Sequence, residues 1–191
     1  MLYISFLENE SENIKRLYTM LLKEADIKSI RENKVTFIKK FSLLKRNYDF
    51  NLLSQLMEEN PLVIDQKSRI GNLQDVFHVP KVSNCLTEFK TFLDFLSKIF
   101  KYENHHNDEI DLFFSFVSQV GESHVDREDV FIMGLKGKVI YKVFGTDVTE
   151  YIIEKGDMIF IPRGIKHKVI GTTPRIVAAA GFFGARMKAQ M

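Results

Sequence analysis

The second half of the chain consists of short apolar or alternating segments, and this pattern restricts the fold more than any other feature. From Ile110 onward, Gly, Pro, Asp or Thr separates each segment from the next. The segments read DLFFSFVSQV, DVFIMGLKG, KVIYKVFG, TEYIIEKG, DMIFIP, HKVIG and PRIVAAAGFF. Short runs with frequent turn residues are typical of β-strands joined by tight connections. Several such strands in succession predict a β-sandwich or barrel.

The first half has a mixed pattern. Apolar residues at helical spacing predict helices over residues 11–26, 50–61 and 84–102, and the third has the longest apolar stripe, which we interpret as core packing. β-branched and aromatic residues predict strands over residues 34–41 and 62–66. This half therefore contributes helices and a few strands to a fold that is mainly β.

A polar segment, YENHHNDE at residues 102–109, separates the two halves. We expect residues 1–107 to form a helical and mixed portion that packs on a β-core of residues 108–191. With 191 residues, the chain is long enough for one continuous domain with a full core.

Composition excludes several kinds of protein. The formal net charge of +2 neither indicates nor excludes nucleic-acid binding. The one cysteine, Cys85, allows neither an intrachain disulfide framework nor a Cys-rich zinc site, and we expect it to be a small buried residue. The N-terminus has acids where a signal peptide needs basic residues, and no apolar run is long enough for a membrane span. We expect a cytoplasmic protein without a membrane partner.

Three polar residues stand where the predicted strands could bring them together. His124 and Asp126 are two residues apart, so they project from the same face if the segment is extended. The segment GDMIFIPRGIKH then predicts turn, buried strand, turn and returning strand, which can place His167 opposite the first two. Two imidazoles and one carboxylate form the facial triad typical of non-haem Fe(II) sites. Structural zinc sites instead favour four protein ligands that leave no coordination position open. Glu128 has the same strand parity as Asp126 and is a rival ligand.

These segments resemble the two cupin motifs. Gly156, Pro162, Gly164 and His167 match the second motif, and SHVDREDVFIMGLKG is similar to the first. Asp126 stands where ordinary cupins have a second histidine, as in the Jumonji-C type cupins, and the first-motif Glu of ordinary cupins comes later than Glu128. The resemblance covers about residues 111–183.

The resemblance implies a double-stranded β-helix (jelly-roll) core and an Fe(II)- and 2-oxoglutarate-dependent oxygenase, a hydroxylase that uses O2. It implies that His124, Asp126 and His167 are both the metal ligands and the catalytic residues. Family members act on protein side chains, RNA nucleosides and small molecules, so the substrate is not predicted. The N-terminal helices could dimerise, and a homodimer is one expectation.

The distal carboxylate of 2-oxoglutarate needs a cation or hydroxyl groups, because an unpaired buried charge is costly. In the resembled family a Lys or Arg often stands where this chain has Val139. Four residues are candidates for binding the co-substrate, namely Lys138, Tyr141, Arg175 and Ser115, and Ser118 could add a hydroxyl. Lys138 would need a bulge near Gly134 or Gly137 to face inward.

Two other readings stay open. The absence of a cation at Val139 favours a metal-dependent cupin that does not use 2-oxoglutarate, either a small-molecule dioxygenase or an isomerase. The other alternative is a non-catalytic cupin that binds a ligand or partner. The remaining histidines, His78, His105 and His106, have no spacing partner and are expected at the surface or at caps.

Overall fold

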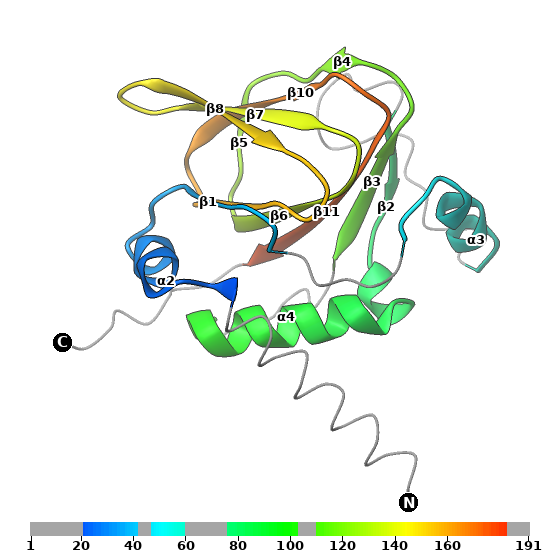
Figure 1. Cartoon of the computed structure of the whole chain (residues 1–191), viewed down its shortest axis with the longest axis horizontal. Helices are drawn as coiled ribbons and strands as arrows, with labels where there is room; N and C mark the ends of the chain where they lie inside the picture. Colours follow the sequence, from blue (N-terminus) through cyan, green and yellow to red (C-terminus); the bar gives the residue numbers. More distant parts are fainter. Residues whose placement is uncertain (1–20, 42–46, 60–75, 103–109, 183–191) are drawn as a thin grey trace, which may run out of the picture.

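A computed structural model describes residues 21–41, 47–59, 76–102 and 110–182. Two antiparallel sheets face each other, and helices lie outside them (Figure 1). The predicted class, mainly β with N-terminal helices and a jelly-roll core, is confirmed. None of the helices described is long and apolar enough to cross a membrane.

The larger sheet has six strands, and its two edge strands come from the first half of the chain. The strand order is β1-β9-β6-β11-β3-β2, and every pairing is antiparallel. Along the chain the strands are β1 (Thr36–Ile38), β2 (Val76–Val79), β3 (Asp111–Ser115), β6 (Asp129–Lys136), β9 (Met158–Ile161) and β11 (Arg175–Phe182).

The smaller sheet has five strands. Its order is β4-β10-β7-β8, and β5 also pairs with β10. The strands are β4 (Gln119–Val120), β5 (His124–Val125), β7 (Val139–Phe144), β8 (Val148–Ile153) and β10 (Lys166–Gly171). After β6 the chain passes to β7 and β8, returns through β9 to the larger sheet, and crosses again through β10 and β11. This alternation between facing sheets is the double-stranded β-helix.

The larger sheet packs a helix on its outer face and the smaller sheet on its inner face. On β11, Ile176, Ala178 and Ala180 belong to the core cluster that includes α4 (Thr87–Phe100), which crosses beneath the sheet in Figure 1. Val177 and Ala179, with the opposite parity, face the second cluster between the sheets. A period of two along a strand therefore separates a helix-packing face from a cavity-forming face.

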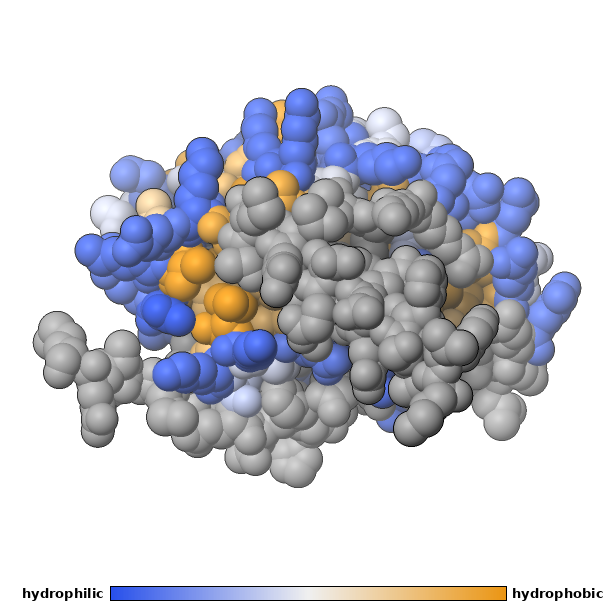
Figure 2. Space-filling view, turned by 60° about the horizontal axis from the view of Figure 1, so that its bottom comes forward, coloured by the Kyte–Doolittle hydropathy of each residue, from blue (hydrophilic) through white to orange (hydrophobic). Residues whose placement is uncertain are grey.

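The remaining helices are short. They are α2 (Glu24–Arg31), α3 (Asn51–Glu59) and the 3-10 turn η1 (Val82–Asn84). On the face shown in Figure 2, apolar residues form separate patches among hydrophilic residues.

Several element boundaries differ from the predictions. The helix expected over 11–26 lies mostly outside the described residues, and the described chain has a bend at Leu22 before α2 continues to Arg31. The single segment expected over residues 111–120 divides into β3 and β4, which belong to different sheets. The strand expected over 62–66 and most of the polar boundary at 102–109 lie outside the described residues. The core cluster of α4 contains residues from both sides of that boundary, such as Phe89 and Phe131.

Candidate metal centre

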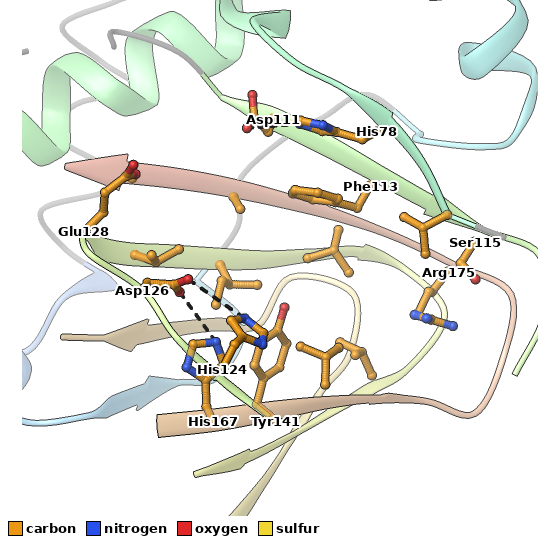
Figure 3. Close-up of a pocket in the computed structure, with 18 of the residues that line it drawn as sticks. His78, Asp111, Phe113, Ser115, His124, Asp126, Glu128, Tyr141, His167 and Arg175 are labelled. Atoms are coloured by element: carbon orange, nitrogen blue, oxygen red, sulfur yellow. Dashed lines mark ion pairs between the residues drawn. The ribbon is translucent and has the colours of Figure 1, made fainter. Parts of the chain in front are cut away.

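Strand pairing brings His124 and His167 together. The two histidines are direct cross-strand partners on β5 and β10, and their ring centroids are 4.4 Å apart. Asp126 follows β5, and its carbonyl accepts a hydrogen bond from the Gly164 amide at 3.0 Å, which holds the two connections together. One ligand atom from each of the three side chains lies within 4.8 Å of the others. Figure 3 shows the three side chains pointing toward one another.

Backbone carbonyls fix the orientation of both rings. His124 Nδ1 lies 3.1 Å from the Glu122 carbonyl, and His167 Nδ1 lies 3.0 Å from the Ile165 carbonyl. A carbonyl only accepts hydrogen bonds, so each Nδ1 carries a proton, and each Nε2 is the ring nitrogen that is left to bind a metal. The Nε2 atoms lie 3.9 Å and 3.5 Å from the Asp126 carboxylate oxygens.

The electrostatics of this cluster suit a cation. Burial lowers the pKa of His167 and outweighs the opposing effect of Asp126, which favours the neutral imidazole. The Nε2 atoms of both imidazoles and the Asp126 carboxylate converge on one point. A divalent metal satisfies all three groups, and this donor set with nitrogen and oxygen but no thiolate suits Fe(II). The three residues therefore fit the predicted metal.

The triad borders a cavity of about 270 Å³ between the two sheets. Three of the four residues predicted to bind the co-substrate, Ser115, Tyr141 and Arg175, also line it. Burial raises the pKa of Tyr141, so its phenol stays protonated and can donate a hydrogen bond. Ser115 donates to the Val117 carbonyl at 3.1 Å and accepts from Gln119 Nε2 at 3.0 Å.

Arg175 is a buried cation in the cavity wall. It is only 5% exposed, and burial lowers its pKa. Its Nη1 donates to the carbonyls of Val117 at 3.0 Å and Thr173 at 3.3 Å. Among the described residues, no carboxylate forms an ion pair with it. An unneutralised buried cation of this kind is a binding point for an anion.

Two other predicted contributors are directed elsewhere. The Lys138 ammonium lies 3.0 Å from the Glu154 carboxylate, and Lys138 is not among the residues that line the cavity. A register shift does occur near Gly134, because β6 pairs Gly134 with Val177 but Lys136 with Ile176, yet it does not turn Lys138 toward the cavity. Ser118 donates to the Thr172 carbonyl and is exposed. Lys138 therefore does not face the cavity, whereas Val139 does line it.

Glu128 lines the cavity without joining the ligand group. Its carboxylate points away from the triad in Figure 3, toward β11. A Cβ at Gly181 would overlap this carboxylate, so the glycine leaves the space that Glu128 occupies. The geometry favours Asp126 over Glu128 as the metal ligand.

A histidine that was not predicted to belong to the site lies on the opposite wall of the cavity. His78 was expected at the surface, but it lines the cavity and stacks on Phe113 at 4.7 Å with an interplanar angle of 4°. Its Nε2 lies 3.1 Å from the Asp111 carboxylate. The alternation of Val76 and His78 in VFHV could have suggested an inward histidine. Cys85 was predicted to be buried, but it is exposed. His105 and His106 lie outside the described residues.

Fold and site together define a double-stranded β-helix protein with a His-x-Asp…His triad at the rim of an internal cavity. Solved structures with this fold include YcfD, a ribosomal oxygenase from Escherichia coli. One YcfD structure has 18% sequence identity and a TM-score of 0.61, covering 87% of this chain and 54% of that chain. A YcfD structure in complex with cobalt and 2-oxoglutarate has 18% identity and a TM-score of 0.57, covering 81% of this chain and 49% of that chain.

The likeness to YcfD establishes the fold. The chain spans about half the length of these structures. No protein-family model matches the sequence, and a search of curated proteins finds no match.

Proposed function

We propose that this chain is an Fe(II)- and 2-oxoglutarate-dependent oxygenase, a hydroxylase of the Jumonji-C cupin type. The observation that carries the proposal is that one cavity is lined by both a two-histidine, one-carboxylate triad and a buried cation without a described acidic partner. A metal alone would explain the triad but not Arg175. A dicarboxylate co-substrate accounts for both the triad and Arg175, because one end of it chelates the metal and the other end needs a cation.

Each residue has a distinct role in this proposal. His124, Asp126 and His167 hold Fe(II) on one side and leave adjacent coordination positions open. Arg175 binds the distal carboxylate of 2-oxoglutarate, and the phenol of Tyr141 and the hydroxyl of Ser115 complete its surroundings. The Val117 and Thr173 carbonyls fix the guanidinium before the ligand arrives. When bound, iron and 2-oxoglutarate supply O2 activation coupled to the formation of succinate and CO2, with hydroxylation of a substrate C–H bond.

Asp126→Ala is the direct test. It removes the one anionic ligand and should abolish succinate formation from 2-oxoglutarate under O2, because Fe(II) is no longer held. The measurement is succinate release, together with the visible charge-transfer band of the anaerobic Fe(II) and 2-oxoglutarate complex. Glu122→Ala changes an exposed side chain close by in sequence, keeps the carbonyl that orients His124, and serves as the control. Full 2-oxoglutarate turnover by Asp126→Ala would contradict the assignment.

A metal-dependent cupin that does not use 2-oxoglutarate is the second candidate. Val139, buried in the cavity wall where the resembled family often has a cation, favours it. Metal binding without any effect of 2-oxoglutarate would support this reading, and no metal binding would support a non-catalytic cupin. A homodimer and a cytoplasmic location stay predictions, and the proposal names no hydroxylated substrate.

A further inference from the structure

The guanidinium of Arg175 lies directly against the backbone of Gly171. A Cβ built on Gly171 would overlap three atoms of that group, namely Cζ, Nη1 and Nη2. Gly171 is the last residue of β10 and Arg175 is the first residue of β11. The side chain therefore folds back across the connection, and the guanidinium occupies the space that a side chain at position 171 would fill.

Backbone geometry does not explain a glycine at this position. The glycines with a left-handed backbone are Gly137, Gly156 and Gly164, and Gly171 is not among them. Gly171 is instead part of a regular ladder, paired with Gln119 on β4 and Val139 on β7. Glycine inside a strand weakens the strand and often marks the close approach of another group. Here the approaching group is the guanidinium.

We propose that Gly171 is a positioning residue that admits the Arg175 guanidinium to the co-substrate end of the cavity. This inference rests on the proposed function. The carboxylate-binding cation then comes from β11, across Gly171, while the cross-strand position on β7 holds the uncharged Val139. One arrangement therefore accounts for two features: position 139 needs no cation, because Arg175 supplies the charge, and position 171 is a glycine, because the guanidinium occupies the space beside it.

The contacts of Arg175 explain why a methyl group at position 171 would matter. Nη1 is held by the carbonyls of Val117 and Thr173. An alanine side chain would push the guanidinium away from this pair of acceptors. Because the overlapping atoms are the end of a flexible side chain, the fold should survive the change. The displaced cation should bind a carboxylate less well.

The test compares two ligands on the same protein. Co(II)-loaded protein is titrated by calorimetry with 2-oxoglutarate and with 2-oxopentanoate, which chelates metal equally but has no distal carboxylate. The wild-type protein should prefer 2-oxoglutarate. Gly171→Ala should reduce this preference about tenfold or more, as expected for losing a well-placed charge-assisted hydrogen bond. Affinity for Co(II) and for 2-oxopentanoate should not change, and a general structural defect would not give this selective result.

Two further variants make the result specific. In Gly145→Ala, the added Cβ meets only the Asp147 carbonyl at 3.6 Å, so this variant should keep the wild-type preference. Arg175→Ala should lose the preference, and adding Gly171→Ala to it should cause no further loss, because the glycine acts only through Arg175.

The outcomes separate the inference from the proposed function. A wild-type protein that binds Co(II) but has no preference for 2-oxoglutarate would contradict the proposed co-substrate. A wild-type preference that survives unchanged in Gly171→Ala would overturn the positioning role alone. A Gly171→Ala protein without the wild-type circular dichroism spectrum would also overturn it, because the fold itself would then require the glycine.

Discussion

At the scale of single residues, two neighbours in the sequence can lie on opposite faces of a strand. Lys138 and Val139 are adjacent, but the lysine pairs with Glu154 while the valine lines the cavity. Alternation along a strand accounts for this separation. The charge that the cavity receives comes instead from Arg175, which is far away in sequence and opposite Ser115 on β3.

A pair of substitutions tests this choice between two cations. Arg175→Ala should weaken 2-oxoglutarate binding to the metal-loaded protein by about 10- to 100-fold, because a charged hydrogen-bonding partner inside a buried site is lost. Lys138→Ala should leave the affinity within about twofold of wild type, because its ion pair is partly exposed and such pairs contribute little. Isothermal titration with 2-oxoglutarate measures both. Equal losses in the two variants would show that the wrong cation has been assigned.

At the scale of elements, α4 closes the side of the larger sheet that is turned away from the cavity. Phe89 and Leu96 on this helix are 0% exposed, and both belong to the cluster that includes Phe131 and Phe160 of the sheet. The helix is thus part of the same core as the strands that carry the cavity wall on their other face. Its contribution is to stability, and it adds no side chain to the triad.

Phe89→Ala tests this separation of stability from site chemistry. The substitution removes a buried ring and should lower the free energy of unfolding by about 3–5 kcal/mol. Lys90→Ala on the exposed side of the same helix should change it by less than about 0.5 kcal/mol. Urea denaturation measures both values. The folded Phe89→Ala protein should still bind Co(II), and a selective loss of metal binding would contradict the division of roles.

At the scale of the whole molecule, the metal centre ties together chain segments that are distant in sequence. His124 and Asp126 come from the β5 region and His167 from β10, so the three ligands converge only when the smaller sheet is assembled. A metal that binds this convergent set binds the folded state better than the unfolded chain. Metal binding should therefore stabilise the entire fold.

This stabilisation can be measured. A metal ion at about 100 times its dissociation constant should add about 2.7 kcal/mol to the free energy of unfolding and raise Tm. A chelator should reverse the increase. His167→Ala should remove the metal-dependent shift, whereas His78→Ala, on the opposite wall of the cavity, should keep it. Differential scanning fluorimetry with and without Co(II) gives the comparison, and a persistent shift in His167→Ala would exclude the site.

Much of the fold could be predicted because its signals are local. Short strands with Gly, Pro and Asp between them predicted the jelly roll, and the apolar stripe of residues 84–102 predicted α4, found at Thr87–Phe100. The triad was predicted from spacing within two short motifs, and the structure brings the same three residues together. The division of residues 111–120 into strands of different sheets was not predicted, because apolar residues continue through the break.

The sequence by itself determined the class of fold and the three residues that converge, because strand periodicity and turn residues act over a few neighbouring positions. Only the tertiary structure decided which cation reaches the cavity, that His78 lines it, and why position 171 is a glycine. These outcomes depend on which strands pair and on which side chains share the same space. Lys138 and Arg175 were both candidates along the chain, and the structure separates them, because Lys138 pairs with Glu154 while Arg175 packs against Gly171 beside the cavity.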